Sequence, residues 1–211
     1  MNVTFYVWSN LVLTSKAPTA TEDTSASDSR EQEPPAKKSN TLLVERGRHD
    51  KLGKYFDLDN ALTVTIKVGG SATYDFCCFG VDANNKLSDD RYMIFYNQLR
   101  SPDSEIVGTE IPSGMEFTLK LNDLPQTIQK LVFTASIDGA GTMGEISRHE
   151  ISIGDKISGE FGGSDFQSEK AITSLEIYRK KGEWRFNVVA RGFNGGLDAL
   201  LAHYGGEQAD N

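Results

Sequence analysis

The chain has 211 residues, enough for one domain of ordinary size with an appendage. Its 30 acidic residues outnumber its 22 Lys and Arg residues, which gives a formal net charge of −8. An acidic surface argues against general nucleic-acid binding, which depends on neutralising phosphates, and it suits a protein that collects cations. No apolar run is long enough to cross a bilayer, and the first residues lack the basic start and small-residue cleavage pattern of a signal peptide. We therefore expect a cytoplasmic protein without a transmembrane segment.

The first 41 residues differ in composition from the rest of the chain. Residues 14 to 41 are rich in Ser, Thr, Pro, Glu and Lys and contain no large apolar residue. Such a segment cannot bury enough apolar surface to offset its ordering entropy, so we predict a flexible linker. The preceding run VTFYVWSNLVL allows three interpretations: a strand that docks on the domain, a short interaction motif, or a remnant of another start. We assign residues 1–41 to a flexible N-terminal extension and residues 42–211 to one folded domain.

From residue 42 onward, short runs rich in β-branched and aromatic residues are separated by turn clusters such as GGSA, DANN and IPSG. Many runs alternate apolar and polar side chains, as in EFTLKL (116–121), which is the pattern of half-buried strands in antiparallel sheets. The sequence RKKGEW (179–184) predicts a tight hairpin. Eight or so short strands with few helices predict an all-β fold, an antiparallel β-sandwich.

One or two short helices accompany the predicted strands. The first is expected at Leu124 to Gln129 and the second at about Gly195 to Tyr204. In the second, three leucines lie on one face: Leu197, Leu200 and Leu201.

Cysteine and histidine chemistry finds little support in the sequence. Cys77 and Cys78 are the only cysteines, and a disulfide between adjacent residues would be strained. Their setting, YDFCCFGV, is typical of a buried strand in which cysteine acts as a small apolar residue. The three histidines are scattered, which leaves too few soft ligands for zinc, and no nucleophile elbow or triad partner is present. We therefore expect no enzymatic activity.

The run GAGTMG (139–144) matches the dinucleotide fingerprint Gly-x-Gly-x-x-Gly. That motif requires a helix directly afterwards, whose amino end receives the pyrophosphate. Here EISRHEISIGD follows, which alternates at Ile151 and Ile153 and indicates a strand that stops at Gly154. We interpret the match as a loop between two strands.

The turn VDANNKLSDD (81–90) concentrates side-chain oxygens between two predicted strands. Asn and Asp form turns readily, and they also supply the oxygen ligands of which Ca²⁺ takes six to eight. The turn is no EF-hand loop, because the twelfth position from Asp82 is Met93, where a bidentate Glu is required. A calcium site would have to be assembled from separate loops. Its candidate ligands are Asp75, Asp82, Asn84, Asp89, Asp90, Asn97, Asp103 and Asp138.

The segment DFCCFGVDANNKLSDDRYMIFYNQLRSPDSEI (75–106) resembles the signature region of the TerD family of bacterial tellurium-resistance and stress proteins. Its Phe-Tyr-Asn and Ser-Pro-Asp triplets are the most specific matches. Further on, LNDLPQTIQKLVFTASIDGA and EIYRKKGEWRFNVVARGFNGGLDALLAHYG resemble later segments of the family, the second its C-terminal hairpin, Gly-Gly-Leu and helix. The similarity covers roughly residues 42 to 206.

The resemblance implies a β-sandwich that binds Ca²⁺ through acidic loops and acts without known enzymatic activity in a cytosolic stress response to tellurite, other toxic agents or phage. It implies partners among the other proteins of the stress system, and through them a peripheral association with a membrane. Among the candidate ligands, Asp75 stands where the family has its strand-entry aspartate. Asp89 and Asp90 cover its Ser-Asp pair, and Asn97 and Asp103 match directly.

Two departures from the family pattern concern the calcium ligands. The first aspartate of the family's Asp-x-Asp pair is replaced by Thr73, and its long Gly/Asp-rich loop is reduced to EIVGTEIPSGMEF (105–117). We therefore expect fewer or weaker calcium sites than in typical members. The alternative is a metal-free scaffold or interaction domain of the same stress system, in which the aspartates only cap turns.

Overall fold

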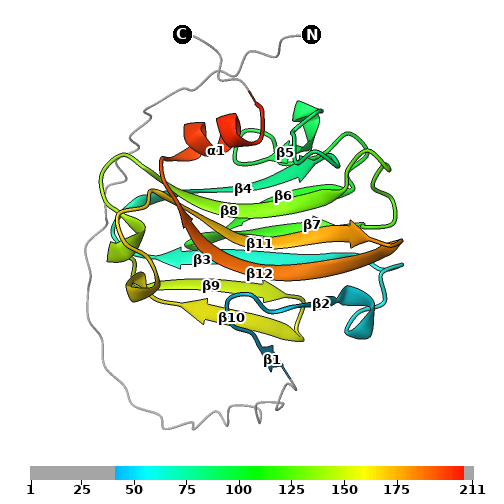
Figure 1. Ribbon diagram of the computed structural model, residues 1–211, viewed down its shortest axis with the longest axis horizontal. Helices are drawn as coiled ribbons and strands as arrows, with labels where there is room; N and C mark the ends of the chain where they lie inside the picture. The colour runs from blue at the N-terminus through cyan, green and yellow to red at the C-terminus, as the bar shows by residue number, and fades with distance from the viewer. Residues whose placement is uncertain (1–40, 207–211) are drawn as a thin grey trace, which may run out of the picture.

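Two six-stranded sheets pack face to face in the computed structural model, which describes residues 41–206 (Figure 1). The first sheet consists, in spatial order, of β1 (Leu42–Leu43), β10 (Ile157–Phe161), β9 (Arg148–Ile153), β3 (Leu62–Gly69), β7 (Gly114–Leu119) and β6 (Ile106–Ile111). The second consists of β2 (His49–Lys51), β12 (Glu183–Phe193), β11 (Ala171–Lys180), β8 (Lys130–Asp138), β4 (Thr73–Val81) and β5 (Met93–Ile94).

The pairings within both sheets are antiparallel, except that β1 lies parallel to β10. The predicted antiparallel β-sandwich is therefore confirmed. One α-helix, α1 (Leu197–His203), and four 3₁₀ turns complete the described part of the chain: η1 (Leu52–Lys54), η2 (Asp90–Tyr92), η3 (Met143–Glu145) and η4 (Gly163–Asp165). Between residues 41 and 206 there is no helix long and apolar enough to span a membrane. The flexible linker predicted for residues 14 to 41 lies outside the described residues, apart from Thr41.

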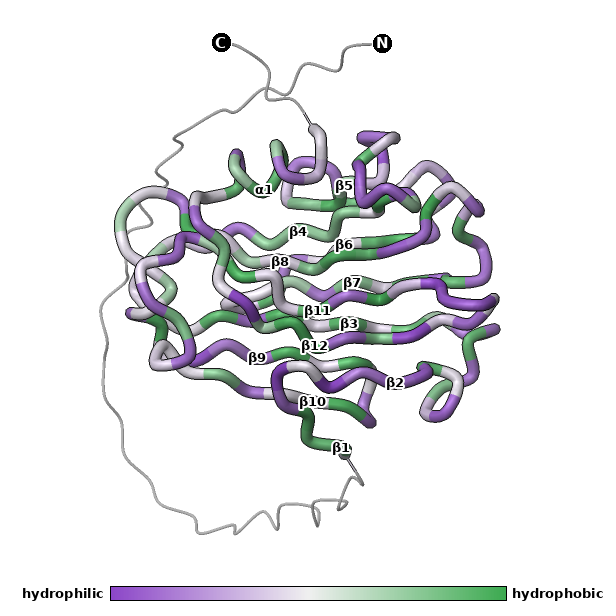
Figure 2. The backbone as a smooth tube through the Cα atoms, in the orientation of Figure 1, coloured by the Kyte–Doolittle hydropathy of each residue, from purple (hydrophilic) through white to green (hydrophobic). Residues whose placement is uncertain are grey.

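The main core fills the space between the two sheets. Strand β3 alternates buried and half-buried residues, so that Leu62, Val64, Ile66 and Val68 point inward, as period-two patterning requires. Apolar segments follow the strands and α1, while hydrophilic segments gather in the loops at both ends of the sandwich (Figure 2). The rings of Phe117 and Phe133, one from each sheet, meet edge to face with centroids 5.3 Å apart. The alternation seen in the sequence thus becomes the packing of the two inner faces.

From Cys77 to Val81, strand β4 is buried on both faces because α1 covers the outer side of its sheet there (Figure 1). Cys78 belongs to the core between the sheets, whereas Cys77 packs in a second cluster with Leu200, Leu201 and Tyr204. The two thiols therefore point to opposite faces of the strand, and both are buried and free. This confirms the interpretation of the cysteines as small apolar residues, and burial raises the pKa of both thiols.

Three local predictions are confirmed and one is wrong. The helix expected at about Gly195 to Tyr204 forms as α1 (Leu197–His203). The hairpin between β11 and β12 has a two-residue turn in which Lys181 and Gly182 both have positive φ, 54° and 77°. The GAGTMG run joins β8 to β9 through η3, so it is a strand-to-strand loop as predicted. The helix expected at Leu124 to Gln129 does not form. Pro125 disfavours helical backbone at the residue before it, and the segment closes a single turn from the Ile128 N–H to the Pro125 carbonyl at 3.0 Å.

Candidate functional site

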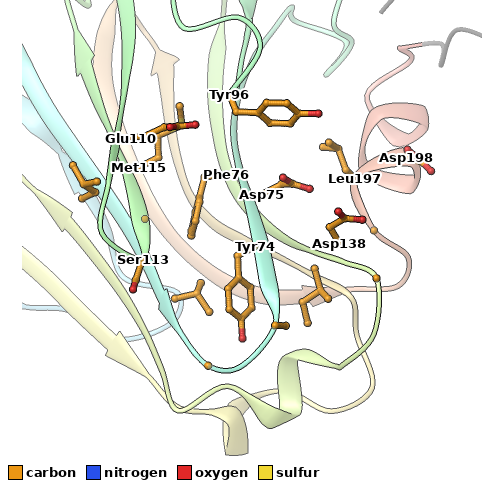
Figure 3. A pocket seen from close by; sticks show the side chains of 18 residues that line it. Tyr74, Asp75, Phe76, Tyr96, Glu110, Ser113, Met115, Asp138, Leu197 and Asp198 are labelled. Carbon is orange, nitrogen blue, oxygen red and sulfur yellow. The ribbon is translucent and has the colours of Figure 1, made fainter. Parts of the chain in front are cut away.

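A cleft of about 940 Å³ opens at one end of the sandwich. It lies where the start of β4 and the end of β8 meet the β6–β7 turn and the beginning of α1 (Figure 3). Within residues 41–206, its lining includes no Lys, Arg or His but four carboxylates: Asp75, Glu110, Asp138 and Asp198. Three aromatic residues complete the chemically distinctive part of the wall: Tyr74, Phe76 and Tyr96. The cleft is therefore suited to a cationic ligand.

Strand register places two of the carboxylates together. In the β4–β8 pair, Asp75 lies opposite Ser136 and Thr73 lies opposite Asp138. Asp75 and Thr73 share one face of β4 because side chains alternate along a strand, so Asp138 is the diagonal neighbour of Asp75. Figure 3 shows the carboxyl groups of Asp75 and Asp138 below Tyr96 and Leu197 in this view, as the register requires.

The Asp75–Asp138 pair has no ion-pair partner among residues 41–206; the ammonium group of Lys170 donates instead to the carbonyl of the adjacent Gly139 at 2.7 Å. Burial raises the pKa of Asp75, and the charge of Asp138 raises it further. Burial also raises the pKa of the Tyr96 phenol, with Asp75 as the next cause. Neither carboxylate forms a hydrogen bond or an ion pair with any residue from 41 to 206. Two neighbouring carboxylates without a counter-charge favour a bound cation.

The DANN turn, by contrast, uses its aspartate locally. One oxygen of Asp82 accepts hydrogen bonds from the backbone N–H groups of Asn84 (2.8 Å) and Lys86 (3.0 Å). Asp82 follows the last residue of β4 and is seven residues from Asp75, ~23 Å at about 3.3 Å per residue. These two aspartates cannot share an ion.

Asp89 is also occupied by its neighbours. Its carboxylate forms an ion pair with Arg91 at 2.7 Å and accepts the Arg91 backbone N–H, which caps η2. The hydrogen bonds from Arg91 lower the pKa of Asp89. Asp90 lies in η2, shortly before Met93. Met93 pairs with Phe79, near the Val81 end of β4, so Asp90 lies at that end and away from the cleft.

The remaining predicted ligands are Asn97 and Asp103, and both are exposed. Asn97 lies next to Tyr96 in the tight turn closed by Phe95 and Gln98. Of the eight predicted ligands, the structure thus brings only Asp75 and Asp138 together in the cleft. Within the described residues, no three His, Cys, Asp or Glu side chains lie close enough to hold a metal ion.

Glu105 is the acidic residue whose role the sequence did not reveal. It is buried, with 3% of its surface exposed, and accepts hydrogen bonds from the Tyr92 hydroxyl (2.8 Å), the Ser101 hydroxyl (2.5 Å) and the Asp103 N–H (3.0 Å). Burial opposes its ionisation, but these hydrogen bonds outweigh burial and lower its pKa. The Ser-Pro-Asp triplet therefore serves to hold this carboxylate. Asp198 was likewise not singled out, because only the folding of α1 against the sheet brings it to the cleft.

The fold and its acidic end define a class of β-sandwich domain with carboxylates gathered at its strand ends. The TerD domain family matches residues 46–204, and the chain belongs to this family. It is 37% identical over 122 residues to the tellurium resistance protein TerA of Alcaligenes sp, a match that covers 56% of this chain but only 36% of that relative. It is 32% identical over 135 residues to the chemical-damaging agent resistance protein B of Clostridium acetobutylicum, covering 56% of this chain and 97% of that protein.

The fold comparison agrees with the family assignment. A crystal structure of a homologue of telluride resistance protein (TerD) from Streptomyces coelicolor superimposes with a TM-score of 0.53 at 20% identity. The match covers 67% of this chain and 94% of that one. At this identity the likeness concerns the fold alone.

Proposed function

We propose that the chain is a non-enzymatic stress-resistance protein that binds Ca²⁺ in the acidic cleft and acts through other proteins of the same response. The resistance role is supported by its relatives, which are named for resistance to tellurium and to chemical damaging agents. The observation that supports cation binding is the Asp75–Asp138 pair, which has no ion-pair partner among residues 41–206.

The cleft fits a weakly held calcium ion. Ca²⁺ takes six to eight oxygen ligands, and Asp75 and Asp138 supply two carboxylates. With no third acidic group within reach among residues 41–206, water and backbone oxygens would have to complete the shell. We therefore expect a dissociation constant on the order of 10⁻⁴ to 10⁻³ M, the range of calcium sites with few charged ligands.

Thermal unfolding with CaCl₂, MgCl₂ and a chelator tests the proposed binding of Ca²⁺ in the cleft. CaCl₂ in the millimolar range should raise the Tm, and MgCl₂ should raise it less because Mg²⁺ releases its water reluctantly. Asp138→Asn should abolish the calcium response. Asp90→Asn is the matched control: it removes one carboxylate at the other end of β4 and should keep the response. If the unmodified chain shows no shift with Ca²⁺ or chelator, the metal-free scaffold function replaces the calcium-binding one.

The resistance role has a separate test in cells. A strain that lacks the gene should become more sensitive to tellurite or to a chemical damaging agent, and the intact gene should restore growth. Unchanged growth under every stress tested would contradict the resistance role without bearing on calcium binding.

A further inference from the structure

A second hollow, of about 380 Å³, lies at the opposite end of the sandwich from the acidic cleft. The segment between β7 and β8 meets the β11–β12 hairpin turn there. Strand β8 runs from this end, next to Gln129, to Asp138 in the cleft, roughly 26 Å at about 3.3 Å per residue. The polar and aromatic residues of the hollow are Asn122, Gln126, Gln129, Arg179, Lys181 and Trp184.

Arg179 is held in a fixed position in this hollow. It lies directly opposite Trp184 in the β11–β12 register, and its guanidinium carbon sits 4.6 Å from the centre of the indole ring. One Nη2 hydrogen bond reaches the Leu124 carbonyl at 2.8 Å. Stacking satisfies the face of a guanidinium, but its N–H groups point outward in the ring plane and require acceptors.

The charge of Arg179 is not compensated. No carboxylate within residues 41–206 forms an ion pair with it, and its buried Nε has no acceptor there. Burial lowers its pKa, and no nearby acidic group raises it. A partly buried charge is normally paired, so the guanidinium lacks an anion.

The rest of the hollow's wall also offers positive charge and hydrogen-bond donors. Lys181 adds a second cation, the side-chain amide of Gln126 offers further N–H groups, and no Asp or Glu of residues 41–206 lines the hollow. The amide of Asn122, also in the wall, already donates to the Asp59 carboxylate at 2.8 Å. This composition is unusual in a chain with 30 acidic and 22 basic residues. Two cations and the Gln126 amide around a small hollow match an acceptor-rich anion.

We propose that this hollow binds a phosphate-class oxyanion, either free or as the phosphoryl group of a larger molecule, with Arg179 and Lys181 as its charged contacts. Guanidinium groups recognise such oxygens through paired N–H donors, and ammonium groups add a point charge. The site is separate from the acidic cleft and does not depend on calcium.

Trp184 provides the readout, because it stacks on Arg179. In a Trp8→Phe background it is the only tryptophan of the chain. Its fluorescence should change saturably on titration with sodium phosphate at constant ionic strength in calcium-free buffer, and sodium chloride should give no saturation. A parallel titration with O-phosphoserine distinguishes the two sources: tighter binding of the ester than of inorganic phosphate assigns the site to a phosphorylated molecule, and the reverse assigns it to the free anion.

Three variants complete the test. Arg179→Gln should weaken phosphate binding at least tenfold. Lys181→Asn should weaken it several-fold, and Asn suits the positive φ of this turn position. Lys180→Gln is the matched control, because Lys180 is exposed, carries the same charge and does not line the hollow. Equal losses in Lys180→Gln and Lys181→Asn, or no saturable signal in the starting protein with either phosphate compound, would overturn the proposal.

Discussion

Replacing Thr73 by Asp should strengthen the calcium site of the cleft. Thr73 lies directly opposite Asp138 and on the same face of β4 as Asp75. The substitution would therefore place a third carboxylate beside the existing pair, at an exposed position where the new side chain has room. Three carboxylates without a cation repel one another, and with Ca²⁺ they form a more complete shell.

The Thr73→Asp variant should lose stability without calcium, through charge repulsion, and gain more stability from bound calcium. Directly opposed side chains have Cβ atoms about 5 Å apart, and two like charges at about 5 Å in water repel by about 1 kcal/mol. Without calcium the variant should thus lose about 1 kcal/mol, or roughly 2–4 °C in Tm. If the third carboxylate tightens the Kd from about 1 mM to about 0.1 mM, stabilisation by 1 mM Ca²⁺ rises from about 0.4 to about 1.4 kcal/mol. The calcium-dependent shift should therefore be about three times larger than in the unmodified chain.

The assay is thermal unfolding of both proteins in chelator and in 1 mM CaCl₂, with Thr73→Asn as an uncharged control of similar size. The control should show neither the loss in chelator nor the enlarged calcium shift. A Thr73→Asp protein that is destabilised in chelator but responds to calcium no more than the unmodified chain would refute the placement of the ion between Asp75 and Asp138.

Three further predictions concern the buried polar groups. Burial lowers the pKa of His149 from 6.5 to about 4, so the unfolded chain binds the extra proton first. The free energy of unfolding should have its full value above pH 6.5 and fall by about 3 kcal/mol as the pH drops to 4. His149→Phe should flatten this pH dependence of the free energy of unfolding, measured by denaturation at several pH values, and an unchanged pH dependence would contradict the assignment. Cys77 and Cys78 should react slowly with a thiol reagent in the native protein and rapidly in denaturant; rapid native labelling would show that the strand is exposed. Glu105→Gln should lower the free energy of unfolding by about 1–3 kcal/mol, because a buried donor loses its acceptor, whereas the exposed Asp103→Asn should change it little; similar losses in both variants would contradict this role.

Much of the fold could be predicted from the sequence because its signals are local. The alternation in EFTLKL (116–121) reappears as β7, and the Lys-Gly turn of the last hairpin adopts the positive φ values that such a turn needs. The helix predicted at Leu124 to Gln129 is replaced by a single turn, closed by the Ile128 N–H on the Pro125 carbonyl.

The candidate site was only half predictable, for a reason that lies in strand register. Asp75 and Asp138 are 63 positions apart by their residue numbers, and nothing local in the sequence states that β4 pairs with β8. Asp82 and Asp89 carry the same chemistry, but each is occupied by donors within four residues: the backbone of Asn84 and Lys86, and Arg91. Composition cannot distinguish a carboxylate that closes its own turn from one left unpaired at a strand end.

The arrangement of charge at the two ends bears on how the proposed sites would act together. The acidic cleft and the Arg179 hollow lie at opposite ends of β8, roughly 26 Å apart at the usual rise per residue. The Debye length at physiological ionic strength is about 8 Å, so a calcium ion at one end is almost fully screened from an oxyanion at the other. The strands between them are packed into the buried core on at least one face. A calcium ion bound in the cleft and a phosphoryl group bound at the hairpin would therefore bind as independent events, without allosteric coupling between them.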